Sequence, residues 1–231
     1  MNYQIDAPGS AIRTTVKLPA SKSISNRALI LNALSYSAYD VENLSDCDDT
    51  NLMVKALNSN DRDFNVGAAG TTMRFLTAFL SKVVGEWTIT GTERMKNRPI
   101  KVLVDALNAL GARIEYMEKE GYPPLRIFGS ALQGGEISLP GNVSSQYISA
   151  ILMIAPLTEN GVTLHLEGAI ISRPYIHITL QLMEQYGVRA SWTENTIKVL
   201  PQEYKPIRFT VESDWSAASY SVSYTHLRAH E

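Results

Sequence analysis

The sequence predicts an α/β (α+β) protein made of three repeated units that close around a pseudo-threefold axis, with parallel helices buried inside. The first observation is a helix start rich in hydroxyl and charged residues, followed at nearly constant spacing by a second helix start. Such pairs of starts occur three times, at residues 21 and 48, 70 and 98, and 144 and 173. The second observation is that strand-like and helix-like apolar patterns alternate within each unit. Repeated α/β units with right-handed crossovers can close in this way, which would bring several helix starts to one end of the domain.

The first unit is expected to contain a strand and two helices. Residues 12–18 alternate in polarity as a strand does and are ended by Pro19. A helix signal begins directly afterwards, and a second helix spans residues 51–57. The residues that we expect these helices to bury are Ala28, Leu29, Leu31 and Leu34 in the first, and Leu52, Val54, Ala56 and Leu57 in the second. Both helices are expected to be half-exposed against a sheet.

The second and third units are expected to repeat one order of elements. In the second unit we predict a helix at 72–80, a strand and turn at 86–91, a helix at 100–110 and a strand at 112–116. In the third unit we predict a helix at 146–154, a strand at 162–166, a helix at 175–186 and a strand at 188–192. Gly111 and Gly187 end the later helices as C′ glycines. Hairpin turns at 122–124 and 133–135 are expected to join the later strands.

The composition excludes several classes of protein. With a net charge of −2 and a pI near 6.1, no global basic field favours nucleic acid or anionic membranes, so any anion site must be a local cluster. The start of the chain lacks a secretory pattern, and the longest apolar stretch, around residues 150–157, is too short to span a bilayer. The single cysteine, Cys47, suits a reducing compartment and is interpreted as structural. We therefore expect a cytoplasmic protein, and we do not interpret His226 and His230 as a metal pair because a third ligand is missing.

The helix starts predict a site for a small, multiply charged anion. A helix start presents unpaired NH groups and the positive end of the helix dipole, and here Ser, Thr, Lys and Arg stand beside it. Each residue also has a simpler interpretation. Lys22 could be a solvated cation, Arg98 could belong to an ordinary helix start before Pro99, and Tyr175 could merely pack on its neighbour. Asp48 and Asp49 are most simply an N-cap and a first-turn acid.

Five motifs in the correct order resemble the 5-enolpyruvylshikimate-3-phosphate (EPSP) synthases, also called 3-phosphoshikimate 1-carboxyvinyltransferases. They lie at residues 18–28, 67–74, 94–99, 144–146 and 171–176. The resemblance implies two domains, each of three βαβαββ units, in the inside-out α/β barrel of the enolpyruvyl transferases. It implies transfer of the enolpyruvyl group from phosphoenolpyruvate to the 5-hydroxyl of shikimate 3-phosphate, with release of phosphate, in chorismate and aromatic amino acid biosynthesis. It implies no metal and no organic cofactor.

The resemblance also assigns site residues. As catalytic residues it implies Lys22 and Arg98. For shikimate 3-phosphate it implies Lys22, Ser23, Arg27, Ser144, Ser145, Gln146, Ser172 and Tyr175. For phosphoenolpyruvate it implies Lys22, Gly70, Arg98 and Gln146.

The chain departs from the family's pattern chiefly in length. Residues 20–207 are expected to form one complete three-unit domain, with residues 1–19 and 208–231 belonging to an incomplete second domain and 221–231 a non-native or truncated tail. The missing half would carry the principal aspartate base, which Asp214 is not. The uncovered segments at 12–18 and from 208 onward should be frayed or expose apolar surface. Smaller departures are Ala68, Phe75 and Arg173.

Two other functions stay open. The chain as given could be a fragment that binds shikimate 3-phosphate without catalysing transfer, because catalysis would need the missing C-terminal domain. Less well supported is an enolpyruvyl transferase that acts on UDP-N-acetylglucosamine.

Overall fold

The computed structural model describes the backbone of residues 15–226 and the side chains of residues 15–220. Two of its three units have the same order of elements. The second unit runs β2 (Asp63–Asn65), α3 (Gly70–Lys82), β3 (Gly85–Thr90), α4 (Glu93–Lys96), α5 (Lys101–Ala109), β4 (Arg113–Tyr116) and β5 (Leu125–Gly129). The third runs β6 (Gly135–Pro140), α6 (Ser145–Ile154), a 3-10 turn (Ala155–Leu157), β7 (Val162–Glu167), α7 (Arg173–Gln185), β8 (Ala190–Thr193) and β9 (Thr196–Val199). These elements confirm the predicted order.

The two four-stranded sheets also share one topology. Their strand orders are β2-β3-β5-β4 and β6-β7-β9-β8. In each sheet the first two strands are parallel and the remaining neighbours are antiparallel. Gly111 and Gly187 have φ of +98° and +88°, as expected for glycines that end helices. The predicted turn at 133–135 is not a hairpin, because it connects β5 of one sheet to β6 of the other.

The first unit is shorter than the other two, so the three repeats are not equivalent. It contains α1 (Lys22–Leu34), β1 (Val41–Glu42) and α2 (Asp48–Leu57). Its sheet has two strands, because β10 (Phe209–Thr210) pairs in parallel with β1 and takes the place of the first strand. The predicted strand at 12–18 is wrong for residues 15–18, which form no strand, and residues 12–14 lie outside the described residues. The paired strands lie on either side of the boundary predicted at 207/208, and the domain division stays a prediction.

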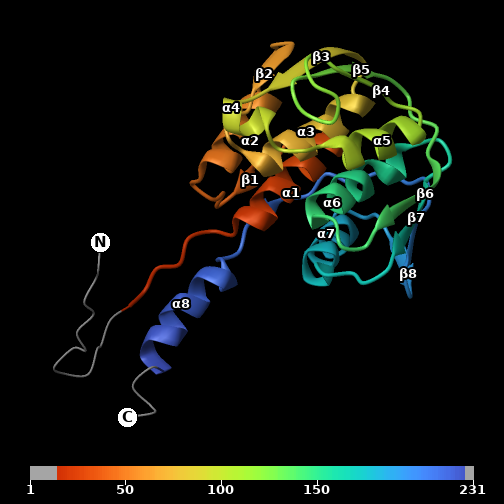
Figure 1. The fold of residues 1–231 in the computed structure, drawn as a ribbon. Helices are drawn as coiled ribbons and strands as arrows, with labels where there is room; N and C mark the ends of the chain where they lie inside the picture. The colour runs from red at the N-terminus through yellow and green to blue at the C-terminus, as the bar shows by residue number, and fades with distance from the viewer. Residues whose placement is uncertain (1–14, 227–231) are drawn as a thin grey trace.

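The helices form the core of the body (Figure 1). The first helices of the three units, α1, α3 and α6, contact one another, and each second helix contacts two of them: α2 contacts α1 and α3, α5 contacts α3 and α6, and α7 contacts α6 and α1. The inner helices are accordingly the most enclosed, and every residue of α6 except Gln146 is buried. The expectation that α1 is half-exposed against a sheet holds only at β1, which α1 contacts; its other contacts are with helices, and seven of its thirteen residues are buried.

Helix α2 buries a different side chain from those predicted. Met53 is fully buried, whereas Leu52, Val54, Ala56 and Leu57 are half-buried. The reason is that α2 packs on α1 and α3 along one narrow face, and no antiparallel strand pair follows it among the described residues as one follows α5 and α7. The local apolar pattern does not contain this information.

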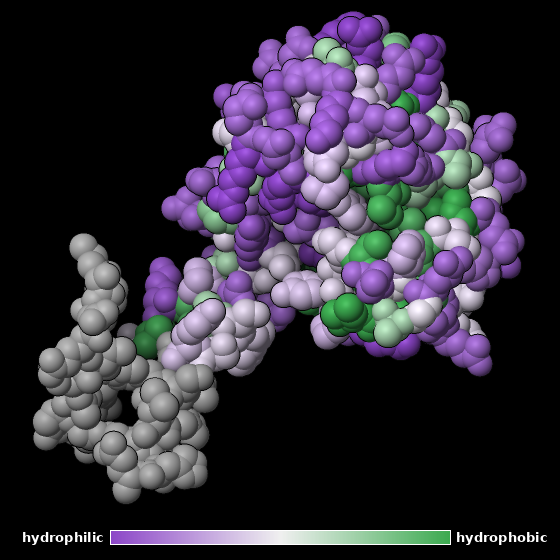
Figure 2. Space-filling model, viewed as in Figure 1, coloured by the Kyte–Doolittle hydropathy of each residue, from purple (hydrophilic) through white to green (hydrophobic). Residues whose placement is uncertain are grey.

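The end of the described chain is partly packed and partly exposed. Val211 is buried with Ala28 and Val41 in a small apolar cluster, so the expectation that the chain is uncovered from residue 208 is wrong for this stretch. Helix α8 (Trp215–His226) instead extends away from the body (Figure 1). Trp215 is 75% and Tyr220 80% exposed, which confirms the predicted exposure of apolar residues there. Figure 2 shows that the visible face of the body is mainly hydrophilic. No helix within residues 15–226 is long and apolar enough to cross a membrane.

The burial of Met53 leads to a stability test. Met53→Ala should lower the free energy of unfolding by about 2–4 kcal/mol, since it leaves a cavity among buried side chains. Leu57→Ala, on the half-buried side of α2, should cost about 1 kcal/mol. Urea unfolding followed by circular dichroism measures both. Equal losses in the two variants would contradict the observed orientation of α2.

Candidate functional site

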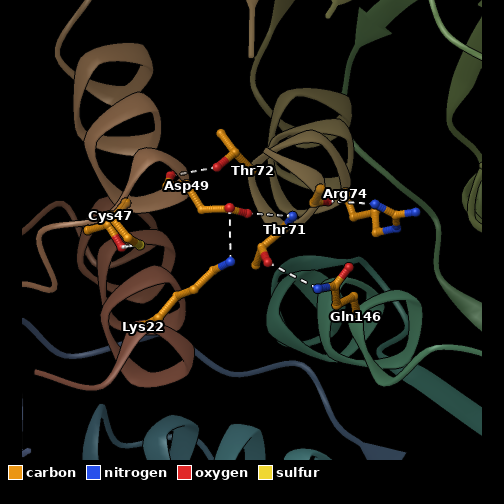
Figure 3. Close-up of polar contacts among 9 residues, drawn as sticks. Lys22, Cys47, Asp49, Thr71, Thr72, Arg74 and Gln146 are labelled. Carbon is orange, nitrogen blue, oxygen red and sulfur yellow. Dashed lines mark hydrogen bonds and ion pairs between the residues drawn. The ribbon is translucent and has the colours of Figure 1, made fainter. Parts of the chain in front are cut away.

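Four helix starts meet at one end of the body (Figure 3). From α1, Lys22 Nζ donates a 2.9 Å hydrogen bond to Oδ2 of Asp49 on α2. The backbone NH of Thr71 at the start of α3 donates to Asp49 Oδ1 at 2.9 Å. From α6, Gln146 Nε2 donates to the Thr71 hydroxyl at 3.0 Å. These contacts place the starts of α1, α2, α3 and α6 side by side, which confirms the convergence predicted from the repeated helix starts.

Asp49 connects these helices, a role that its interpretation as a first-turn acid does not predict. Its carboxylate accepts bonds from both Lys22 and Thr71, and its backbone carbonyl accepts a 2.6 Å bond from the Thr72 hydroxyl. It therefore caps α3 rather than its own helix, whose N-cap residue is Cys47. The Cys47 thiol lies 3.3 Å from the Thr50 hydroxyl within the same turn, a local structural contact. The sequence offers one signal for this role: Asp49 is an acid at one helix start, and Lys22 is a cation at another.

Two guanidinium groups press against Gly70 at the start of α3. A Cβ atom at Gly70 would lie 2.8 Å from Nη2 of Arg98 and 2.9 Å from Nη1 of Arg74, with Nη1 of Arg98 closer still. Only glycine therefore leaves room for both groups. Burial, and then the positive charges of Arg74 and Arg94, lower the pKa of Arg98. Arg98 nevertheless stays cationic at neutral pH, because arginine is the most basic side chain in proteins.

The start of α6 completes this end of the molecule. The Ser144 hydroxyl accepts a 3.3 Å bond from the Gln146 backbone NH and so caps the helix, and Ser145 is buried beside it. The Tyr147 hydroxyl donates to the Pro99 carbonyl at 2.7 Å, which fixes the segment carrying Arg98 against α6. Lys22, Arg98 and the two serines are thus all connected through the starts of α3 and α6.

Arg27 lies deeper than a surface ligand would require. It is 2% exposed, and its Nε, Nη1 and Nη2 donate to the Thr179 hydroxyl at 2.7 Å, the Ser23 carbonyl at 2.9 Å and the Ser149 hydroxyl at 2.9 Å. It therefore ties α1 to α6 and α7. Burial lowers the pKa of Arg27 to about 10, against a smaller opposing effect of Tyr175, so the group is still charged at neutral pH. Its predicted contact with a ligand stays a prediction.

The start of α7 presents the remaining predicted residues. Ser172 occupies the N-cap position but makes no side-chain cap bond, and Tyr175 is 44% exposed. Ser23 is half-buried and meets Arg27 through its carbonyl. The Thr179 hydroxyl accepts a bond from Arg27 of α1 and donates to the Tyr175 carbonyl at 2.9 Å, so the first turns of α7 lie beside α1.

A cavity of about 450 Å³ adjoins the site beside α2. Asp48, Asp49 and Leu52 line one side, and residues 67–69 line the other. Ala68, one of the departures from the family's pattern noted in the sequence, contributes to this lining. Among the side chains that the structure describes, those of residues 15–220, no cluster of His, Cys, Asp and Glu could hold a metal ion.

The crowding at Gly70 gives a direct test. Gly70→Ala should displace the Arg98 guanidinium, the mobile end of a flexible side chain, while leaving the fold intact. Loss of this charged group should weaken binding of inorganic phosphate or phosphoenolpyruvate about tenfold or more, measured by calorimetry. Gly70→Ala added to Arg98→Ala should cost less affinity than the sum of the two single losses, because both changes act on Arg98, although the new methyl group also lies against Arg74. Additive losses would show that the methyl group acts elsewhere.

The bridging role of Asp49 gives a second test. Asp49→Ala should lower the free energy of unfolding by about 1 kcal/mol, because the Thr71 NH loses its cap. Asp49→Asn should cost less, since the amide oxygen can still accept that bond. Asp48→Ala removes the same charge from the same turn of α2 but no bond to α3, and it serves as the control. If Asp48→Ala and Asp49→Ala proved equally destabilising in thermal unfolding, the cap would have no energetic role.

Comparison with known proteins gives a consistent result. A profile of the EPSP synthase (3-phosphoshikimate 1-carboxyvinyltransferase) family matches residues 7–60 and 58–227. The chain is 61% identical over 221 residues to a 3-phosphoshikimate 1-carboxyvinyltransferase of Bacteroides fragilis, covering 95% of this chain and 54% of that protein. It is 42% identical over 253 aligned positions to one of Vibrio campbellii, covering 97% of this chain and 59% of that protein. The chain thus spans somewhat more than half the length of these curated relatives.

The structural comparison confirms the fold class. The solved structure of an EPSP synthase from Acinetobacter baumannii superposes with a TM-score of 0.78 at 21% sequence identity. The superposition covers 89% of this chain and 51% of the other. The sequence and the structural comparisons therefore agree that this chain matches about half the length of its relatives.

Proposed function

Since the chain belongs to the EPSP synthase family, we propose that its site holds phosphoenolpyruvate and shikimate 3-phosphate for transfer of the enolpyruvyl group to the 5-hydroxyl of the latter. The observation that carries this proposal is that two cations reach the start of α3: Lys22 is linked to Thr71 through Asp49, and Arg98 lies against Gly70. The transfer itself would require the part of the relatives' length that this chain does not span. We thus propose that this chain corresponds to about half of a 3-phosphoshikimate 1-carboxyvinyltransferase and does not catalyse the transfer alone.

The chemistry of the site supports anionic ligands. Phosphoenolpyruvate carries a phosphate and a carboxylate, and charge-assisted bonds from Lys and Arg are the strong means of holding both. The NH groups and dipoles of several helix starts add to this attraction. The overall charge of −2 makes the cationic cluster a local feature, which selects small ligands over polyanions.

We assign the residues to two neighbouring groups. Lys22, Gly70, Arg98 and Gln146 surround the proposed position of phosphoenolpyruvate. Ser23, Arg27, Ser144, Ser145, Gln146, Ser172 and Tyr175, with Lys22, would hold shikimate 3-phosphate. Lys22 is paired with Asp49 in the absence of a ligand, but its side chain is 45% exposed. The Asp49 side chain is only 15% exposed, but it would keep the Thr71 NH as a hydrogen-bond partner if Lys22 turned towards a ligand.

The proposed reaction is an addition followed by an elimination. The 5-hydroxyl oxygen bonds to C2 of phosphoenolpyruvate while its proton leaves to a base and C3 gains a proton. The phosphate then departs with the C2–O bonding pair, and C3 loses a proton to restore the double bond. Lys22 and Arg98 would stabilise the negative charge on the departing phosphate. We do not assign the base to Asp49, the carboxylate in contact with Lys22, because its two oxygens accept bonds from Lys22 and the Thr71 NH.

A second candidate function follows from that observation: this chain alone binds shikimate 3-phosphate without transferring anything. It differs from the first only in activity, and both require the anion site. We expect the isolated chain to bind and not to turn over.

Calorimetry with shikimate 3-phosphate and a phosphate-release assay with both substrates separate these functions. Lys22→Met should weaken binding about tenfold to a hundredfold, the worth of a charge-assisted bond. Lys198→Met, an equal change of charge at an exposed position on β9, should leave binding unchanged. Failure of the unmodified chain to bind either substrate would refute the proposed site, and release of phosphate would show that this half is catalytic alone.

A further inference from the structure

Arg74 is a buried cation whose hydrogen-bonding capacity is only partly used within the protein. It lies one turn after Gly70 on α3 and is 5% exposed. Its Nη1 donates to the Gly70 carbonyl at 2.8 Å, and its guanidinium carbon lies 5.3 Å from the centre of the Tyr147 ring. Its Nε has no hydrogen-bond partner. A buried polar group without a partner costs free energy, so this one requires an explanation.

The charge of Arg74 is not balanced either. Among the residues that the structure describes, neither Arg74 nor Arg98 forms an ion pair with a carboxylate, although both guanidiniums lie against Gly70. The acid nearest in the network, Asp49, already accepts bonds from Lys22 and Thr71. The mutual effect is visible in Arg98, whose pKa is lowered first by burial and next by Arg74. Two neighbouring cations without a counterion are unfavourable in a partly desolvated site.

We propose that Arg74 is a positioning residue for the anion at this site: its charge, fixed by Gly70 and Tyr147, combines with that of Arg98 to attract one dianionic phosphate group. This inference rests on the proposed function and adds a cation that none of the sequence motifs assigned to a ligand. The ligand's negative charge would supply the counterion that the protein lacks. The free energy lost by placing two guanidiniums together in the empty site is then recovered on binding.

A purely structural role explains Arg74 less well. Its one hydrogen bond to protein is made to the carbonyl of a residue on the same helix, four positions earlier. Its remaining contact is the face of Tyr147, on which an uncharged side chain of similar length could also pack. Arg27 shows what a structural arginine looks like in this protein, because each of its three nitrogens donates to a protein oxygen and links three helices.

The two roles predict opposite combinations of stability and affinity. The experiment compares Arg74→Met, Arg74→Lys and the unmodified 231-residue chain by thermal unfolding, with and without inorganic phosphate and phosphoenolpyruvate. Arg74→Met should unfold at the same temperature or higher without a ligand, because a buried uncompensated charge is removed. It should nevertheless lose most of the rise in unfolding temperature caused by phosphate, with affinity lowered about tenfold. Arg74→Lys, which keeps the charge, should recover part of that rise.

Arg113→Met provides the matched control for net charge. Arg113 lies on β4 at the surface, pairs with Glu115 at 2.8 Å and packs on Phe128. The variant Arg113→Met should leave unchanged the rise in unfolding temperature that phosphate causes. If Arg74→Met lowers the unfolding temperature and keeps the full phosphate response, Arg74 is structural and this inference is overturned alone. If neither anion raises the unfolding temperature of the unmodified chain, both the proposed function and this inference fail.

Discussion

The structure depends on how its buried helices are joined at the end where their NH groups lack intrahelical partners. Closing α1, α3 and α6 on one another buries polar atoms that water would otherwise bond, so side chains must replace that water. Asp49 does this between α1, α2 and α3, and Arg27 does it between α1, α6 and α7. Both are charged residues whose bonds cross between helices, and they fix the relative positions of the helix starts before any ligand arrives.

The same arrangement creates the electrostatic character of the site. The helix dipoles, Lys22, Arg98 and Arg74 gather positive potential at one end of a chain that is slightly acidic overall. Asp49 offsets part of this charge from the side of α2. The anion that we propose for this site would require little reorganisation, because the donors are already in place. Two guanidiniums are crowded together at Gly70 in this arrangement.

The shortened first unit explains how the ends of the described chain relate to the body. Units two and three each complete a four-stranded sheet from consecutive sequence, whereas β1 receives its parallel neighbour from β10, far along the chain. Asn43 strengthens this junction with a 2.6 Å bond from Nδ2 to the Val211 carbonyl. The chain therefore returns to α1 before it leaves the body as α8. This junction places the start of α1 next to the start of α8, because the Ser21 NH donates to the Glu212 carbonyl at 2.9 Å.

The sequence by itself determined the repeat, the helices and strands of units two and three, and the convergence of the helix starts. It could do so because helix caps, C′ glycines such as Gly111 and apolar periodicity act over a few neighbouring residues. The family resemblance added candidate ligand residues, but no local pattern indicated that Arg27 is enclosed, that Met53 faces the core or that Asp49 caps a different helix. No local pattern indicated the pairing of β1 with β10 or the Arg74 nitrogen that has no hydrogen-bond partner. Only the tertiary structure decided these features, because each depends on contacts between helices, strands and side chains that packing, rather than chain neighbourhood, brings together.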